Sequence, residues 1–446
     1  MKYNASVIGL GKLGASMMAG MASRGLSLVG VDISQTAVDA VNGGCAPVLE
    51  TDLDITIKKY KSNIHATTSF EEAVFETDIS FVIVPTPSDS NGAFSLTYVK
   101  EAFTEIGKAL KRKNTYHTVV VTSTVLPGSC RYGLLPVLEK ESGKKCGNDF
   151  GLCYNPEFIA LGSVIKDFLN PDFYLLGQFD ERSGDALEAI HNRVSANKAP
   201  IKRMSLENAE IAKIAINSFV TLKISYANLL SEICEQVPTA DIDIVSDAVG
   251  TDSRIGRKYL TGGLGFGGPC FPRDNIALDF LGRQLGIDST LLKVNDTYNR
   301  NNGRRILDRF KGMLPNSGKV SVLGLSYKPF SNITEESASI ILTESLQNAG
   351  YSVHAYDPLV KDGVNCIFSE SIQECLIDAA AVFITTADPE FISLYEDDFP
   401  EDAVVIDFWR CLEPGVQNSK RIKYVPAGRF LNSSSSNSVL EDLWKK

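Results

Sequence analysis

Short apolar runs rich in β-branched residues alternate with helical stretches over the first part of the chain. The runs read "ASVIGLG", "LSLVGVD", "ISFVIVPTP", "HTVVVTSTV" and "FGLCYNPEF". Continuous apolar runs separated by helices are typical of a parallel sheet that is covered on both faces. The pattern therefore predicts a doubly wound, Rossmann-like α/β domain over residues 1–200.

The pattern changes after Pro200 and returns near the C-terminus. A helical pattern without Gly or Pro runs from about Leu206 to Gln236, and helical stretches continue to about residue 310. The later runs "VSVLGLS", "VHAYDP", "AVFITTADP" and "AVVIDFWR" repeat the order of the first part but lack its glycine pattern. We expect an α/β protein with two Rossmann-like doubly wound domains joined by a central helical domain with one long helix. The predicted domains are residues 1–200, 201–312 and 313–446.

The charge and the cysteines narrow the function classes. The chain has 446 residues and a formal net charge of -10, so it has no bulk attraction for nucleic acid or an anionic membrane. No apolar run approaches the ~18 residues that span a bilayer, and "MKYNASVIGLG" lacks the plan of a signal peptide. The nine cysteines show no paired metal spacing, and the four histidines are far apart. We therefore expect a cytoplasmic protein with reduced thiols and no metal.

A glycine pattern follows the first apolar run. Gly9, Gly11 and Gly14 form G-x-G-x-x-G between a predicted strand and a predicted helix. Such glycines make the turn, admit a pyrophosphate and let the helix pack on the strand, while the helix N-terminus attracts the phosphates. Asp32 ends the next strand, where a carboxylate accepts ribose hydroxyls and repels a 2′-phosphate. The pattern predicts an NAD site; the alternative is a turn that is merely rich in glycine.

Polar residues follow three further strands, at the edge where an open sheet binds its ligand. In "VPTP" (84–87) and "TSTVLPG" (122–128), Thr86, Ser123 and Thr124 could bond cofactor or substrate, or could cap the next helix. In "NPEF" (155–158), Glu157 follows a turn that would fix its carboxylate for acid–base work. An exposed turn glutamate is the alternative.

Two further sets of residues could carry chemistry. Glu210, Lys213 and Asn217 share one face of the long helix, so the lysine and the amide could bind an oxyanion. A solvated Glu–Lys pair is favoured there by spacing alone. In "GFGGPCFPRD" (265–274), Cys270 is a nucleophile or a packed thiol, since a metal site lacks partner ligands. A thiolate in a hydride-transfer enzyme would turn an aldehyde into a thioester and then an acid.

Together these motifs resemble the UDP-glucose/GDP-mannose dehydrogenase family of nucleotide-sugar 6-dehydrogenases. The resemblance covers nearly the whole chain, in the family's order, and rests on "GLGKLG" (9–14), "VPTP", "STVLPG" (123–128), "NPEF", "AEIAKIAINSF" (209–219), "GTDSRIG" (250–256), "GFGGPCFPRD", "VLGLSYKP" (322–329) and "YDP" (356–358). It implies four-electron oxidation of a sugar C6 hydroxyl to a carboxylate with NAD, most simply UDP-glucose to UDP-glucuronate. GDP-mannose and a UDP-N-acetylhexosamine are the alternative substrates, and a binding protein that has lost catalysis is an alternative of another class.

The resemblance also implies roles for single residues. Cys270 resembles the nucleophile, Lys213 and Asn217 the oxyanion partners, Asp274 the residue that positions water, and Glu157 the group that assists hydrolysis with Thr124. The implied cofactor residues are Gly9, Gly11, Lys12, Leu13, Gly14, Asp32, Pro85, Thr86, Ser123, Thr124 and Arg273. The implied substrate residues are Glu157, Phe158, Lys213, Asn217, Arg254, Tyr259, Gly262, Gly265, Phe266, Gly267, Tyr327, Lys328 and Arg410, the last as a phosphate ligand. Arg254 resembles an arginine that reaches a neighbouring subunit, which implies a homodimer through the central helices.

Three positions depart from the family's pattern. Leu161 stands where the family often has glutamate, Phe173 where it has arginine, and Glu335 near the place of another arginine. These changes leave the reacting residues in place, but they bear on the choice of substrate and on cofactor affinity.

Overall fold

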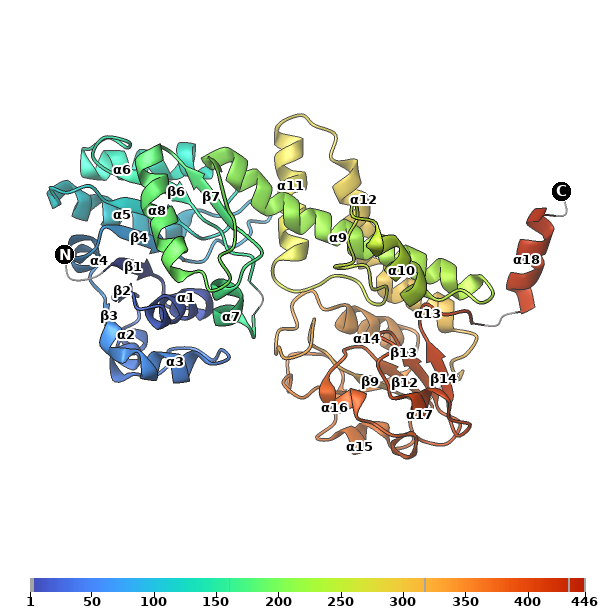
Figure 1. Cartoon of the computed structure of the whole chain (residues 1–446). Coiled ribbons are helices and arrows are strands. Elements are labelled where there is room, and N and C mark those ends of the chain that lie inside the picture. The colour runs from blue at the N-terminus through green and yellow to red at the C-terminus, as the bar shows by residue number, and fades with distance from the viewer. Residues whose placement is uncertain (1–3, 160, 317, 432–433, 445–446) are drawn as a thin grey trace. The chain divides into compact units, whose positions relative to one another are not determined.

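The computed structural model describes residues 4–159, 161–316, 318–431 and 434–444. The chain forms two compact units, Met1–Ile216 and Asn217–Lys446, each built around its own sheet (Figure 1). The two sheets, with helices between them in the sequence, confirm the predicted fold class.

The first unit holds an eight-stranded sheet in the order β3-β2-β1-β4-β5-β6-β7-β8. Its neighbouring strands pair in parallel except β6 and β7, which are antiparallel. The strands are β1 (Ala5–Ile8), β2 (Leu28–Val31), β3 (Ile64–Thr67), β4 (Ile79–Val82), β5 (Thr118–Val121), β6 (Gly151–Tyr154), β7 (Tyr174–Gln178) and β8 (Ile201–Ser205). Because β1, β2, β4, β5 and β6 are buried throughout, they read as continuous apolar runs.

Helices cover both faces of this sheet and form two apolar clusters. One cluster takes its helical members from α1 (Lys12–Ser23), α2 (Gln35–Gly43), α3 (Leu53–Lys59), α7 (Val164–Leu169) and α8 (Glu181–Val194). The other takes them from α4 (Phe70–Glu76), α5 (Thr97–Arg112), the π-helical η2 (Ser129–Leu134), α6 (Leu135–Ser142) and the start of α9. The short η1 (Lys61–Asn63) precedes β3. The candidate residues of the sheet lie in the loops that follow β1, β2, β4, β5 and β6, whose carboxyl ends share one edge because these strands are parallel.

The second unit contains the helical stretch and a six-stranded parallel sheet. The long helix α9 (Leu206–Gln236) has the predicted bounds and crosses the boundary between the units. It is followed by α10 (Ile242–Thr251), α11 (Phe271–Gln284), α12 (Thr290–Arg300) and α13 (Asn302–Phe310). The sheet has the order β11-β10-β9-β12-β13-β14, the order of the first six strands of the other sheet.

The bounds of the remaining elements complete the second unit. The strands are β9 (Lys319–Leu323), β10 (Ser352–Tyr356), β11 (Ile367–Phe368), β12 (Ala381–Ile384), β13 (Val404–Asp407) and β14 (Lys423–Pro426). The helices are α14 (Ala338–Asn348), α15 (Ile372–Leu376), α16 (Pro389–Ile392), η3 (Glu396–Asp398), α17 (Pro414–Gln417) and α18 (Ser434–Trp444).

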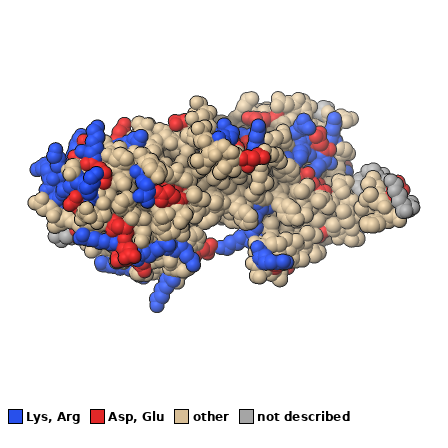
Figure 2. Space-filling view, turned by 90° about the horizontal axis from the view of Figure 1, so that it is seen from above, with Lys and Arg blue, Asp and Glu red and all other residues tan. Residues whose placement is uncertain are grey.

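The surface carries charges of both signs. Figure 2 shows Lys and Arg side chains interspersed with Asp and Glu side chains over one face. Among the residues that the structure describes, no helix combines the length and the hydropathy that crossing a bilayer requires.

Candidate functional site

The turn after β1 is shaped by glycines. Gly9 has φ 98°, and a Cβ there would lie 2.1 Å from the carbonyl oxygen of Ile83. A Cβ on Gly14 would lie 1.9 Å from the carbonyl oxygen of Gly9, so only glycine lets α1 start this close to the strand. Gly11 is different, because a Cβ there would meet no protein atom within 4 Å. The turn is therefore closed against the strand and open on the side of Gly11.

The open side of the turn suits a pyrophosphate. Gly11 is the N-cap residue of α1 and no side chain caps the helix there. The first N–H groups of a helix have no partner within the helix and carry the positive end of its dipole. Lys12 and Leu13 form the start of α1. The residues present thus fit the diphosphate of a dinucleotide, which would approach the backbone at Gly11.

Asp32 follows β2 and turns its carboxylate back to the glycine turn. Its Oδ2 accepts the N–H of Leu10 at 2.7 Å and its Oδ1 accepts the N–H of Ser34 at 2.8 Å. The residue is partly exposed. Since each carboxylate oxygen can accept more than one bond, the oriented group keeps capacity for ribose hydroxyls.

The loops after β4 and β5 are bonded to each other. The Ser123 hydroxyl donates to the carbonyl of Val84 at 2.6 Å and accepts its N–H at 2.9 Å. The Thr86 hydroxyl donates to the carbonyl of Thr124 at 2.8 Å. The helix-capping alternative is wrong for these two hydroxyls, because each bonds the main chain of the other loop. The N-cap residues of the helices that follow are Leu96 and Gly128.

Glu210 also holds the loop after β5, and spacing did not reveal this. The residue is fully buried on α9, and its carboxylate accepts the N–H groups of Gly128 at 2.6 Å and Cys130 at 2.8 Å. These groups start η2, whose own N-cap residue offers no side chain. The alternative of a solvated Glu210–Lys213 pair is wrong, since both residues are buried. Burial raises the pKa of Glu210, and the two N–H bonds oppose that rise.

The turn after β6 is held by buried Asn155, the first residue of "NPEF", whose partners the sequence did not reveal. Asn155 donates from Nδ2 to the carbonyl of Leu175 at 3.1 Å, and its Oδ1 lies 2.8 Å from Nε2 of His191. Burial lowers the pKa of His191 to about 3, so the ring is neutral and Nε2 is the donor. The ring of His191 also stacks on Tyr174, with centroids 4.1 Å apart.

Glu157 and Lys213 meet beyond this turn. Lys213 donates from Nζ to the main-chain carbonyl of Glu157 at 2.6 Å, and the ammonium lies 4.3 Å from the ring centre of Phe158. Phe173, at a position where the resemblance implies arginine, packs on Phe158 with centroids 5.3 Å apart. Burial raises the pKa of Glu157 to about 8, opposed by the charge of Lys213. A carboxyl group with such a pKa can hold or release a proton near neutral pH.

In the second unit, Cys270 lies at the start of α11. It is exposed and is the N-cap residue of the helix, whose positive end favours an anion there. One turn later Asp274 is buried, and its Oδ2 accepts a bond from Nδ2 of Asn217 at 2.6 Å. Arg273 forms an ion pair with Asp274 at 3.7 Å. The structure therefore brings Asn217 and Asp274 together one helical turn from the thiol.

Two glycines of the cysteine loop, as we name residues 265–270, allow other segments of the chain to approach closely. A Cβ on Gly267 would lie 2.3 Å from the carbonyl oxygen of Glu336, and one on Gly268, whose φ is 82°, would lie 2.7 Å from the ring of Tyr327. The N–H of Gly268 donates to the main-chain carbonyl of Glu335 at 2.9 Å, while the Glu335 side chain is exposed. Tyr327, a predicted substrate residue, therefore lies against the cysteine loop.

The other predicted substrate residues have diverse settings. Phe266 is buried, with its N–H and carbonyl bonded by Asn299 at 2.9 and 2.8 Å. A Cβ on Gly265 would meet Asn299, and one on Gly262 would meet Ile242. Arg254 is exposed and pairs with Asp252. Tyr259 is also exposed. The ammonium group of Lys328 lies 5.6 Å from the ring centre of Tyr327, its neighbour in the sequence.

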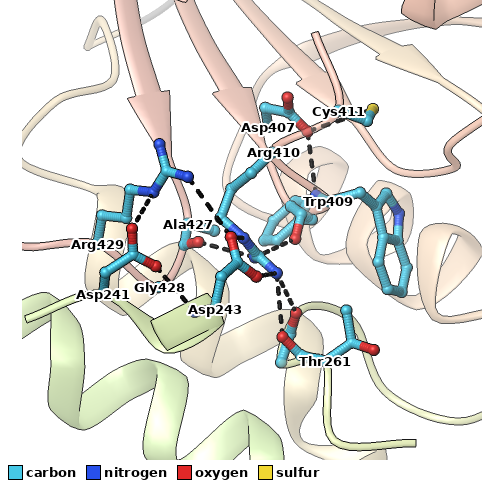
Figure 3. A network of polar contacts seen from close by, with 12 residues as sticks. Asp241, Asp243, Thr261, Asp407, Trp409, Arg410, Cys411, Ala427, Gly428 and Arg429 are labelled. Carbon is cyan, nitrogen blue, oxygen red and sulfur yellow. Dashed lines mark hydrogen bonds and ion pairs between the residues drawn. The ribbon is translucent and has the colours of Figure 1, made fainter. Parts of the chain in front are cut away.

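Arg410 is buried at the end of β13. Figure 3 shows its guanidinium group directed to Asp243 and to main-chain carbonyls. Within the described ranges no group of three or more His, Cys, Asp or Glu residues is placed to hold a metal ion.

The chain matches one protein family over most of its length. In the UDP-glucose/GDP-mannose dehydrogenase family, residues 3–195 match the NAD binding domain, residues 207–301 the central domain and residues 321–414 the UDP binding domain. The match of the first segment confirms NAD as the predicted cofactor.

Several known proteins resemble the chain over nearly its full length. The UDP-glucose 6-dehydrogenase AglM of Haloferax volcanii is 35% identical over 412 residues, which covers 90% of this chain and 95% of that protein. The GDP-mannose 6-dehydrogenase of Pseudomonas syringae pv. tomato is 34% identical, with the same two coverages. The structure of a UDP-glucose dehydrogenase from Pyrobaculum islandicum aligns with a TM-score of 0.84 at 32% identity and covers 96% of this chain and 98% of that one.

Proposed function

The chain belongs to the UDP-glucose/GDP-mannose dehydrogenase family of NAD-dependent nucleotide-sugar 6-dehydrogenases, and from this premise we propose that it oxidises UDP-glucose to UDP-glucuronate. The observation that carries the proposed chemistry is the thiol of Cys270 at the N-terminus of α11, one turn from the bonded pair Asn217–Asp274. An alcohol-to-carbonyl oxidation would need no thiol, whereas oxidation to an acid uses one to hold the aldehyde.

Except for Arg273, the residues that the resemblance implies for the cofactor lie in the first unit. Gly9, Gly11 and Gly14 would admit the diphosphate at the N-terminus of α1, and Asp32 would bond the adenosine ribose. When bound, NAD supplies one kind of chemistry, the acceptance of a hydride. Ser123 and Thr86 keep the two neighbouring loops together and so hold the wall of the cofactor site.

Cys270 would act between the two oxidations. Its thiolate adds to the C6 aldehyde carbon and forms a thiohemiacetal, whose C6 oxygen carries the negative charge until the second hydride leaves C6. Lys213 and Asn217, as donors, would stabilise that oxyanion. After the second hydride has left C6, the carbon is a thioester, and water attacks it to release the acid and the thiol.

Glu157 and Asp274 would serve this hydrolysis. Because the pKa of Glu157 is raised to about 8, its carboxyl group can take a proton from the attacking water and return it to the leaving sulfur. Asp274, oriented by the amide of Asn217, would position the water, with Thr124 supporting it.

GDP-mannose is the second candidate substrate. It is favoured by the 34% identity to the Pseudomonas syringae enzyme, close to the 35% identity to AglM. Turnover on a panel of UDP-glucose, GDP-mannose and UDP-N-acetylhexosamines separates the candidates by NADH formation. We expect kcat/KM to be highest for UDP-glucose. Formation of NADH with GDP-mannose alone would replace the proposed substrate, and formation with none of them would favour a binding protein that has lost catalysis.

We further propose that two copies associate through the central helices, in the cytoplasm. On α9, Phe219, Tyr226 and Ile233 recur every seven residues and are 62%, 53% and 49% exposed, so they form one apolar stripe. Ile244 on α10 is 69% exposed as well. Such a stripe suits a helix interface. Sedimentation should report a dimer for the wild type and a smaller species for Phe219→Glu; a monomeric wild type would contradict this.

A further inference from the structure

The guanidinium group of Arg410 has an acceptor for every N–H. Its Nε donates to Oδ2 of Asp243 at 2.9 Å, and its Nη2 donates to Oδ1 of the same residue at 3.0 Å. Its Nη1 donates to the carbonyls of Phe408 at 2.7 Å and Ala427 at 2.9 Å. The side chain is 1% exposed. Arg410 thus joins the ends of β13 and β14 to the first turn of α10 (Figure 3).

The same guanidinium group also holds the nucleotide loop, as we name residues 261–267. Its Nη2 lies 3.0 Å from the carbonyl oxygen of Thr261 and 3.2 Å from that of Gly262. In Figure 3 the guanidinium group of Arg410 is directed toward Thr261 of this loop. This loop resembles the family's segment that wraps the substrate nucleotide, and it contains the implied substrate residues Gly262, Gly265, Phe266 and Gly267.

Neighbouring residues leave the nucleotide loop little freedom. Asn228 of α9 accepts the N–H of Gly263 at 2.9 Å and donates to the carbonyl of Leu264 at 3.0 Å. A Cβ on Gly263 would lie 3.1 Å from the ring of Trp409. Arg410 itself has φ 55°, a conformation that a residue with a Cβ adopts only where its surroundings hold it. The backbone and the side chain of Arg410 are therefore both fixed beside this loop.

We propose that Arg410 is a positioning residue that holds the nucleotide loop in its binding conformation, and that it is not a ligand of the substrate phosphates. To reach a phosphate, the guanidinium group would have to leave Asp243, and the carbonyls of Thr261 and Gly262 would lose their donor. A buried acceptor without its donor is unfavourable, so the arrangement opposes that movement. This inference rests on the proposed function, because the loop has a nucleotide to bind only if the substrate is a nucleotide sugar.

Binding of free nucleotides separates positioning from phosphate contact. Calorimetry compares the monophosphate and the diphosphate of the base that the wild type prefers, UMP with UDP or GMP with GDP. A positioning residue affects the whole nucleotide, so Arg410→Met should weaken both by the same factor, about tenfold, as expected for one to two lost bonds. Arg410→Lys, which keeps the charge but has fewer donors, should fall between the wild type and Arg410→Met.

Arg429 offers a matched control. It lies beside Arg410 and pairs with Asp241 at 2.8 Å and with Asp243 at 3.5 Å, and in the part of the chain described no bond joins it to the nucleotide loop. Arg429→Met should therefore leave nucleotide affinity within about twofold of the wild type. Urea unfolding, which reports on the second unit that holds both arginines as well as on the first, serves as the check that each variant is folded.

The outcomes divide clearly. If the loss for Arg410→Met is much larger with the diphosphate than with the monophosphate, Arg410 is a phosphate ligand and the proposal is wrong. An unchanged affinity for both nucleotides would overturn it as well. Should Arg410→Met fail to fold, the same comparison is made with Arg410→Lys. If the wild type binds neither nucleotide series, the proposed function fails instead, which is a separate result.

Discussion

The two sheets of this protein follow the same plan up to the first turn and differ after it. Gly9 and Gly324 both end the first strand with positive φ, 98° and 106°. In each sheet the residue after this glycine donates its N–H to an aspartate that follows the second strand, at 2.7 Å. These aspartates are Asp32 and Asp357.

The two aspartates differ in what else they bond. Asp357 is 2% exposed and accepts four N–H groups, those of Leu325, Ser326, Leu359 and Val360. Asp32 is partly exposed and accepts two. In the second sheet the helix α14 starts only at Ala338, so no helix N-terminus follows the glycine turn directly. The carboxylate of Asp357 is therefore occupied by main-chain N–H groups of its own turn. The carboxylate of Asp32 is oriented by two such groups and can still accept bonds from a ligand.

Replacing Asp357 should have the largest effect. Asp357→Ala leaves four N–H groups without their acceptor, three of them belonging to buried residues. At about 1–3 kcal/mol for each unsatisfied group, and with some relaxation, we expect a loss of about 5 kcal/mol in the free energy of unfolding. Urea unfolding measures this. Asp357→Asn should lose less, and a loss below that of Asp32→Ala would break the comparison.

Acid should act on the first unit through its buried histidine. His191 is neutral in the folded state, with its pKa lowered to about 3, and binds a proton in the unfolded state below about pH 6.5. The unfolded state then holds more protons than the folded state. The free energy of unfolding therefore decreases as the pH is lowered from 6.5 to 3, by about 1.4 kcal/mol per pH unit. Glu157, whose pKa is raised, acts in the opposite direction.

The prediction therefore concerns the difference between two proteins. From pH 6.5 to pH 5 the wild type should lose about 2 kcal/mol more than His191→Gln in urea unfolding. The second sheet provides the control, since His354 is only partly buried and His354→Gln should follow the wild type closely. Parallel curves for the wild type and His191→Gln would show that the ring is not buried and neutral.

Glu210 should matter for turnover more than for stability. Glu210→Gln offers one acceptor in place of two, so the loop that starts at Gly128 loses a bond. A displacement near 1 Å can lower turnover by roughly 100-fold, and we expect kcat to fall about 10- to 100-fold. Glu207→Gln, which removes a partly exposed pair with Arg131, is the control and should keep kcat within about twofold. Equal values of kcat for both variants would refute the role of Glu210.

Asp32→Ala should have the smallest effect in energy. Loss of the ribose bonds should raise the KM for NAD+ about tenfold, the equivalent of one charged hydrogen bond, and leave the affinity for nucleotide sugar unchanged. The substitution should also lower the ratio of kcat/KM for NAD+ to kcat/KM for NADP+, because the charge that repels a 2′-phosphate is gone. Steady-state kinetics with both cofactors measures this. An unaltered KM for NAD+ would mean that Asp32, like Asp357, serves only its own turn.

The sequence predicted the features that depend on local order. The apolar runs of β1, β2, β4, β5 and β6 are fully buried strands, and the helix Leu206–Gln236 has the expected ends, because burial and helix-breaking residues leave a periodic signal. The glycine pattern was informative because steric limits within the turn dictate the residue type. Only glycine fits where a Cβ would meet the chain at 1.9 Å.

The partners of buried polar groups could not be predicted. Glu210 bonds residues about 80 positions away, and Arg410 bonds Asp243, 167 positions away. Spacing suggested a solvated pair for Glu210, because periodicity reports which face a residue occupies and not which segment packs on it. The phosphate contact of Arg410 was implied by the resemblance, which likewise says nothing of the bonds that its side chain makes within this chain. His191 carried no motif at all. Its role follows only from the position of Asn155.

The number of NADH molecules formed per sugar tests the central claim most directly. The claim is that Cys270 carries the sugar through both oxidations, so limiting UDP-glucose with excess NAD+ should give about two NADH per sugar, and Cys270→Ser should abolish steady turnover. One NADH per sugar with an aldehyde product, or full activity of Cys270→Ser, would contradict it.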